Sequence, residues 1–280
     1  MNPQINPLRQ FFRQPAIYIK LPSLGNHWPK DTLAMPDNGE LPVLPMTAID
    51  EISYRTPDAL FNGQAVVNVI QSCIPNIRDA WAMPNTDLDT LLLAIRIASY
   101  GHELELSSTC PACGHQHEFS VDLRGIMDRL KKPNFEIPLV NGDIEIHFKP
   151  LSYQQVVENS IRQFEEQKVL SILPDSDVAE EEKLKLLNQT IMKLTRYTVI
   201  AAAQCIAMIK TPQAMVSEQP WIQEFLANCE SHVFNQIKDH LVALREATDI
   251  PPLQLDCPEC KHRYDQTFTL DQSNFFAPAS

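Results

Sequence analysis

The sequence predicts an α+β protein that is mostly helical and carries three short β-hairpins. Two Cys-Pro-x-Cys motifs each lie between stretches in which apolar and polar residues alternate, and this pattern predicts two hairpins with cysteines at their tips. An Asn-Gly pair between two further alternating stretches predicts the third hairpin. Apolar residues at helical spacing dominate residues 46–101 and 151–252, which we expect to be helical.

The composition indicates a protein with a substantial core and no features of a nucleic-acid or membrane protein. The chain has 280 residues, of which 44% are hydrophobic and 21% charged, and this excludes global disorder. Its net charge is −12 and it has no cluster of Lys and Arg, so we expect neither nucleic acid nor an anionic membrane as a partner. Its longest apolar stretch, 199–209, is shorter than the roughly 20 residues of a membrane helix.

The expected compartment is the cytosol. The first 14 residues lack the apolar segment of a signal peptide. In a reducing compartment, the seven cysteines stay free or bind metal.

Residues 1–45 are predicted to form an extended, Pro-rich N-terminal arm. This segment contains eight of the 22 prolines, which stiffen and extend a chain. Residues 16–21 alternate in polarity and predict a short strand. Apolar residues such as Phe11, Phe12 and Trp28 favour docking of the arm on a surface over a free terminus.

Residues 46–101 are predicted to form a helical segment. Thr56-Pro57 is typical of a helix start, and residues 64–73 fit either a helix or a strand. A further helix is expected to begin near Asn85 and to end at Gly101.

Residues 102–123 and 253–271 are predicted to form the two halves of a zinc ribbon. In the first half, Cys110 and Cys113 lie between the alternating stretches 103–106 and 118–123. In the second half, Cys257 and Cys260 lie between 253–255 and 263–270. Residues 124–150 hold the third hairpin, in which 135–139 and 143–148 flank Asn141-Gly142.

Residues 151–252 are predicted to form a helical insertion between the two ribbon halves. Ser152 and Gln155 have the spacing of a capping box, and three helices should follow over 183–210, 217–228 and 231–245. The first has an apolar face that predicts a place in the core of a bundle, with a partner helix as the alternative. That face consists of Leu184, Leu187, Ile191, Leu194, Ala201, Cys205 and Met208.

The four motif cysteines, Cys110, Cys113, Cys257 and Cys260, are predicted to bind one structural zinc ion. Zn²⁺ takes four thiolates tetrahedrally, and a site with four Cys ligands has no open position for catalysis. The separation of the two motifs, by residues 114–256, exceeds the usual 15–20 residues of a ribbon. A rubredoxin-type iron fits the same ligands, whereas a redox dithiol needs a helix start that neither motif has.

Other polar residues near the predicted site have ordinary structural interpretations. His115, His117 and His262 can replace a Cys ligand, but we interpret them as solvated or as neighbours of the ligands. Cys73, Cys205 and Cys229 are expected to be buried thiols. The group Asp87, Asp89, Arg96 and His102 is interpreted as an acidic helix start with a polar face.

The sequence contains no phosphate-binding loop, dinucleotide-binding turn or hydrolase motif, and we expect no enzyme activity. A nucleic-acid-binding zinc ribbon is the alternative, but the ribbon strands carry far more acidic than basic residues.

Several segments between residues 40 and 160 resemble one protein family. They include Pro45-Met46-Thr47, Leu60-Phe61-Asn62-Gly63, Ile74-Pro75, Asp87-Leu88-Asp89, residues 91–101 ending in Ser-Tyr-Gly, and Cys110-Pro111-Ala112-Cys113. Together they are similar to the baseplate hub subunit and hub assembly proteins of T4-like tailed phages.

The resemblance implies a non-catalytic structural or chaperone-like assembly protein of a contractile-tail baseplate hub. Its partners would be other hub or tail proteins, without nucleic acid or membrane. It would act in the host cytoplasm during assembly and could remain in the virion.

Overall fold

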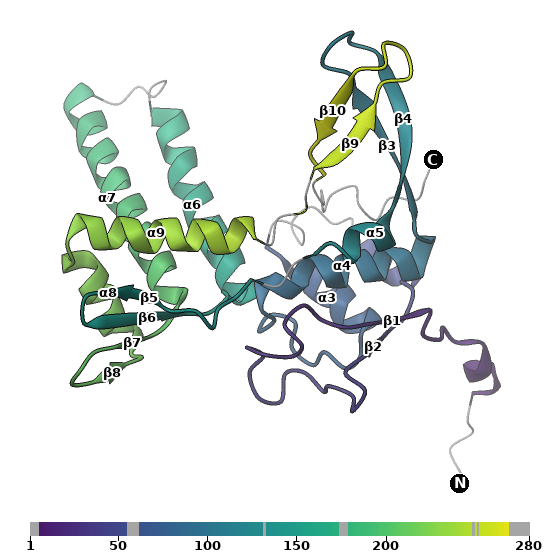
Figure 1. Ribbon diagram of the computed structural model, residues 1–280, viewed down its shortest axis with the longest axis horizontal. Coiled ribbons are helices and arrows are strands. Elements are labelled where there is room, and N and C mark those ends of the chain that lie inside the picture. The colour runs from purple at the N-terminus through teal and green to yellow at the C-terminus, as the bar shows by residue number, and fades with distance from the viewer. Residues whose placement is uncertain are drawn as a thin grey trace. The chain divides into compact units, whose positions relative to one another are not determined.

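The computed structural model describes residues 6–54, 62–130, 133–173, 179–247, 250 and 252–268, and its architecture is α+β as predicted (Figure 1). The chain forms two compact units. The first consists of Met1–Ala80, Asp87–Leu130 and Ile250–Ser280, and the second of Trp81–Thr86 and Lys131–Asp249. None of the described helices is long and apolar enough to cross a membrane. The predicted helix start at Thr56-Pro57 and the end of the predicted strand beyond residue 268 lie outside the described residues.

The N-terminal arm docks on its own unit. After the short 3-10 helix η1 (Pro7–Phe11), strand β1 (Ile17–Ile19) pairs antiparallel with β2 (Leu41–Val43), which confirms the predicted short strand. Ile19, Leu41 and Val43 of this pair are at most 4% exposed. Arg13 anchors the arm, because its guanidinium donates to the carbonyl oxygens of Pro45 and Ser72 at 2.7 and 2.8 Å.

Four of the described α-helices belong to the first unit. They are α1 (Ala48–Tyr54), α3 (Gln64–Cys73), α4 (Asn85–Tyr100) and α5 (Leu123–Met127). The ambiguous segment 64–73 is therefore a helix, and α4 has the predicted start and ends before Gly101, whose φ is 88°. Residues 91–95 of α4 are at most 1% exposed, so this helix is central to the core.

The predicted polar face of α4 is wrong, because two of its charged residues are buried. Asp87 is fully buried and accepts hydrogen bonds from the Ser23 backbone N–H at 2.9 Å and from Trp28 Nε1 at 2.8 Å. Arg96 is 2% exposed, and its guanidinium lies 4.5 Å from the centre of the Tyr100 ring. Specific partners within the unit thus replace the solvent contacts that we expected.

The second unit contains a four-stranded antiparallel sheet in the order β5-β6-β7-β8. The strands are β5 (Leu139–Asn141), β6 (Ile144–Phe148), β7 (Ile206–Lys210) and β8 (Met215–Val216). The helices are α6 (Tyr153–Ile172), α7 (Glu180–Gln204), α8 (Gln219–Asn228) and α9 (Ser231–Glu246). The capping box of Ser152 and Gln155 is present at the start of α6. Asn141 is the last residue of β5, and Gly142 has a φ of 57° in the turn to β6.

The prediction that 183–210 is one helix is wrong. Helix α7 ends at Gln204, and residues 206–210 form a strand that pairs with β6, with Ile146 opposite Ile209. Ile206 and Ile209 are buried in the core of this unit, so tertiary packing overrides the helical pattern. The helical insertion expected over 151–252 therefore contains two strands, β7 and β8.

The predicted core face of this helix is wrong in its first half. Leu184, Leu187 and Ile191 are 59, 37 and 49% exposed. Only the end of α7, with Ala202 and Ala203, belongs to the buried cluster of the unit.

Candidate metal centre

Two hairpins of the first unit bring the four motif cysteines together. Strand β3 (Glu103–Thr109) pairs with β4 (Gln116–Asp122), and β9 (Leu253–Asp256) pairs with β10 (Arg263–Gln266). The two hairpins lie side by side with their turns at the same end (Figure 1).

The two Cys-Pro-x-Cys turns have the same backbone hydrogen bonds. The Cys110 N–H donates to the His115 carbonyl at 3.0 Å, and the Gly114 N–H donates to the Cys110 carbonyl at 2.9 Å. The second turn repeats both bonds: the Cys257 N–H donates to the His262 carbonyl at 2.9 Å, and the Lys261 N–H to the Cys257 carbonyl at 3.0 Å. Gly114 and Lys261 occupy the same left-handed position, with φ of 72° and 59°.

The sulfur atoms of Cys110, Cys113, Cys257 and Cys260 all lie within 4.8 Å of one another. The distances from Cys110 to Cys260 and from Cys113 to Cys257 are both 3.7 Å. A regular tetrahedron with metal–sulfur bonds of about 2.3 Å has edges of about 3.8 Å. Two of the separations match this edge and the others do not exceed 4.8 Å, so four thiolates in these positions can surround one metal ion.

The electrostatics of the cluster favour a cation at its centre. The backbone N–H groups of Cys260 and Glu259 hold the pKa of the Cys257 thiol down, at about 6. The backbone N–H of His115 lowers the pKa of Cys113, but the facing sulfurs of the other cysteines outweigh it and raise that pKa to about 12. Four thiols so close together cannot all lose their protons unless a positive charge compensates them.

A small polar network links the two hairpins below the cluster. The buried Ser108 hydroxyl donates to Gln266 Oε1 at 2.7 Å and therefore accepts from the Tyr264 hydroxyl at 2.8 Å. His117 Nε2 lies 3.4 Å from the same Tyr264 hydroxyl. His115 and His262 are exposed, and each accepts a hydrogen bond of its turn through the backbone carbonyl; His115 also donates its backbone N–H to Cys113. Sequence reasoning did not identify Ser108 or Tyr264, because neither belongs to a motif.

A family comparison covers most of the chain. Residues 46–277 match the family described as T4 bacteriophage base plate protein. The chain belongs to this family. The match extends over segments of both units and includes all four ribbon cysteines. The predicted resemblance to T4-like baseplate proteins is confirmed at this level. No curated protein and no solved structure matches the chain.

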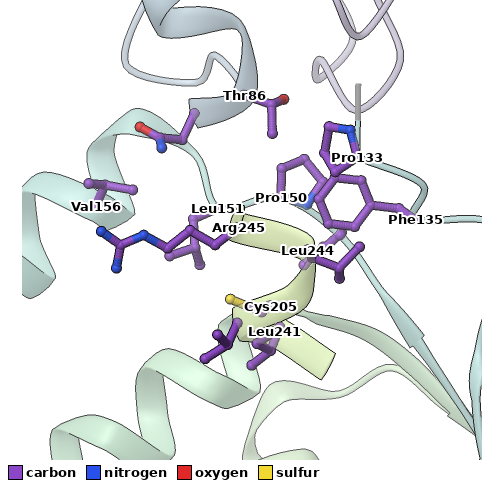
Figure 2. A pocket seen from close by; sticks show the side chains of 13 residues that line it. Thr86, Pro133, Phe135, Pro150, Leu151, Val156, Cys205, Leu241, Leu244 and Arg245 are labelled. Atoms are coloured by element: carbon purple, nitrogen blue, oxygen red, sulfur yellow. The ribbon is translucent and has the colours of Figure 1, made fainter. Parts of the chain in front are cut away.

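The second unit of this baseplate protein has a cavity of about 360 Å³ (Figure 2). Its lining is mostly apolar and includes Phe135, Leu151, Leu244 and Cys205. Burial raises the pKa of Cys205 to about 11, so its thiol stays protonated and is a poor nucleophile at neutral pH. The residues that line this cavity include no His, Asp or Glu, and its charged side chains are Lys149 and Arg245.

The other free thiols are similarly unreactive. Burial, together with the Asp50 carboxylate, raises the pKa of Cys73 to about 12, and burial also raises the pKa of Cys229. Cys73 is fully buried as predicted, whereas Cys205 and Cys229 are only partly buried. Among the described residues, the ribbon cysteines are thus the set of side chains best suited to bind a metal.

Proposed function

We propose that this baseplate protein is a non-catalytic hub component, either a subunit or a chaperone-like assembly factor, whose ribbon holds one structural zinc ion. The baseplate role follows from the family match over residues 46–277. The observation that carries the zinc assignment is the four-sulfur cluster, whose 3.7 Å separations fit tetrahedral coordination.

A structural role for the metal is supported by the ligand set. Four cysteines fill all the positions of a tetrahedral ion, which leaves no position for substrate or water. Ligand pairs from two such turns are typical of zinc, and iron is the competing occupant. The metal would connect two hairpins that are about 140 residues apart in the chain, and so it would close a long loop.

Assembly with other baseplate proteins is supported by the surface of the first unit. Phe11 and Phe12 are 76 and 54% exposed, and Ile49 and Ile52 on α1 are 75 and 71% exposed. Large apolar side chains in such numbers at a surface favour protein partners. The ribbon strands expose Glu103, Glu105, Glu118, Asp122, Asp256 and Asp265. This acidic surface is unsuited to bind nucleic acid.

Metal analysis of the purified chain tests the zinc assignment. Native mass spectrometry should find one zinc ion per chain, and the double variant Cys110→Ser/Cys257→Ser should lose it. Cys229→Ser, which removes a cysteine outside the ribbon, is the matched control and should keep the metal. Retention of the metal by the double variant would contradict the proposed site, and so would a wild-type chain without metal. One iron ion per chain would show that the site binds iron and not zinc.

The assembly role is tested by following the chain through infection. Quantitative mass spectrometry should find it bound to tail or baseplate proteins in lysates of infected cells. A fixed copy number in purified virions would identify a subunit, whereas presence only in assembly intermediates would identify an assembly factor. Salt-sensitive DNA binding by the purified chain, without any association with tail proteins, would instead support the nucleic-acid alternative.

A further inference from the structure

The cavity of the second unit has the size and the lining of a site for a small ligand. Its volume of about 360 Å³ lies within the roughly 300–1,000 Å³ of ligand pockets. Phe135, Val156 and Leu244 are among its apolar residues, and they come from segments far apart in the sequence (Figure 2). Every lining residue belongs to the second unit, so the cavity is complete within this unit.

Main-chain hydrogen bonds between lining residues hold the walls of the cavity in place. The Lys149 N–H donates to the Cys205 carbonyl at 2.8 Å and links the end of β6 to the end of α7. The Asn85 N–H donates to the Leu151 carbonyl, also at 2.8 Å. Because these walls are already formed, a ligand does not have to order them, and this lowers the free-energy cost of binding.

The charged side chains of the lining are both basic, although the chain carries a net charge of −12. One of them, Arg245, is exposed and already interacts with another residue. The other, Lys149, is half-buried, and its ammonium has no ion pair or hydrogen bond within the part of the chain that the structure describes. Lys149 is therefore the cation that a ligand can meet.

The ammonium of Lys149 lies close to the apolar lining. Burial raises the pKa of the Cys205 thiol, and the positive charge of Lys149 opposes this rise. Cys205 is itself a lining residue, so the charge acts at the wall of the cavity. Next to apolar surface a charge is poorly screened by water, and it attracts an opposite charge more strongly than it would in solution.

We propose that this cavity binds an apolar acid, whose carboxylate pairs with Lys149 and whose apolar group lies among the apolar lining residues. Such a ligand gains from the burial of its apolar group and supplies the acidic partner that the lining lacks. The one available ammonium matches the single charge of a carboxylate better than the charge of nearly two on a phosphate ester. A neutral apolar ligand would leave the half-buried ammonium without a partner.

Two kinds of molecule carry this chemistry. One is a small monocarboxylic acid, and the other is the C-terminal residue of a protein chain when its side chain is apolar. Both present a single carboxylate next to an apolar group. The proposal depends neither on the metal site nor on the role of the protein in the baseplate, so its failure would leave both of those unaffected.

Isothermal titration calorimetry of the full chain with two matched pairs of probes tests the proposal. Octanoate represents a free acid and N-acetylphenylalanine a C-terminal residue, while octanamide and N-acetylphenylalaninamide have the same apolar groups without the charge. At least one acid should bind saturably, and its Kd should be lower than that of its amide by a factor of about ten or more. The acid that binds more tightly identifies the source of the ligand.

Variants of two lining residues show whether binding takes place in the cavity. Lys149→Met removes the charge and should weaken acid binding by a factor of about ten or more without changing amide binding. Val156→Trp fills the cavity and should abolish the binding of acids and amides alike. Lys168→Met is the matched control, because Lys168 is exposed on α6 and is not a lining residue, and it should bind both acids as the wild type does. Circular dichroism and thermal unfolding check that each variant folds.

Equal Kd values for each acid and its amide would overturn the proposal, because the charge would then contribute nothing to binding. Unchanged acid binding in Lys149→Met, or in a correctly folded Val156→Trp, would place the ligand elsewhere and overturn it as well. The absence of saturable binding of both acids up to their solubility limits would have the same consequence.

Discussion

The ribbon and the β5–β8 sheet are both small antiparallel structures, but different interactions hold them together. The sheet lies in a cluster of ten buried apolar side chains, including Phe148, Ile206 and Ile237. The buried cluster of the ribbon consists of Cys110, Cys257 and Tyr264, with the partly buried Leu255 beside it. Apolar burial can hold the sheet, whereas the ribbon has little to bury except the cysteines themselves.

The burial of individual strands shows the same difference. Of the seven residues in each of β3 and β4, only Ser108 and Val121 are buried. In β6, Ile146 and Phe148 are both at most 2% exposed within only five residues. Two-stranded hairpins without a covered face are marginally stable in water. We therefore expect the two cysteine hairpins to need an added link, such as the proposed metal, and the sheet to need none.

The largest predicted effect is the loss of the two cysteine hairpins when the proposed metal is removed. A structural zinc ion contributes on the order of 10 kcal/mol to such a site, more than the ribbon can gain from its own burial. Chelation, or Cys110→Ser/Cys257→Ser, should abolish the hydrogen-exchange protection of residues 103–122 and 253–266 while residues 144–148 and 206–210 keep theirs. Equal loss of hydrogen-exchange protection in the hairpins and in the sheet would contradict this prediction. Unchanged protection in the hairpins would contradict it as well.

A substitution in the core of the sheet should cause a smaller loss of stability, and this loss should not depend on metal. Ile206 is fully buried, and Ile206→Ala should lower the free energy of unfolding of the second unit by about 3 kcal/mol through lost burial and a cavity. Chemical denaturation measures this change, and the metal content should remain that of the wild type. Met215→Ala, at a side chain of the same sheet that is 65% exposed, is the control and should change stability by less than about 0.5 kcal/mol.

The sequence predicted the two cysteine hairpins better than the four-stranded sheet. The two cysteine motifs are local signals, and each hairpin lies where its motif indicated, around residues 110 and 257. The pairing of β6 with β7 joins segments about 60 residues apart and leaves no local signal, so 206–210 was expected to continue α7. The helical pattern of α7 was correct up to Gln204, where the burial of Ile206 in the sheet replaces it.

Partners of single polar residues could not be predicted. The sequence places Asp87 at the start of a helix, and the structure confirms this. It does not indicate that Ser23 and Trp28 would donate hydrogen bonds to the Asp87 carboxylate. Similarly, the network of Ser108 with Tyr264 follows from the packing of one hairpin on the other. Contacts between distant segments depend on tertiary structure, and propensity and periodicity report only local structure.

A moderate effect is expected from the polar link between the ribbon halves. Ser108→Ala removes both hydrogen bonds of the buried hydroxyl and leaves Gln266 and Tyr264 without this partner, which should cost about 1–2 kcal/mol. Thermal unfolding of the metal-loaded chain should show this loss in the ribbon signal only. Ser107→Ala, at the exposed neighbouring position, is the control. If Ser108→Ala and Ser107→Ala change the unfolding temperature equally, the hydrogen bonds of Ser108 do not help to hold the two hairpins together. The metal would then be their main link, in contrast to the apolar core that holds the sheet.

The smallest effect is expected from substitutions in the two Cys-Pro-x-Cys turns. Their hydrogen bonds match, but the left-handed position holds Gly114 in the first turn and Lys261 in the second. A side chain costs about 1 kcal/mol in this conformation, and a glycine does not pay that cost. Lys261→Gly should therefore stabilise the ribbon by somewhat less than 1 kcal/mol, since glycine also gains entropy in the unfolded chain, and Gly114→Ala should destabilise it. The resistance of the bound metal to a competing chelator measures both changes. If Lys261→Gly increases the resistance to chelation and Gly114→Ala decreases it, the backbone of the turns, and not only the sulfur atoms, helps to form the metal site. A decrease for Lys261→Gly would mean that the lysine side chain stabilises the turn by more than its backbone strain destabilises it.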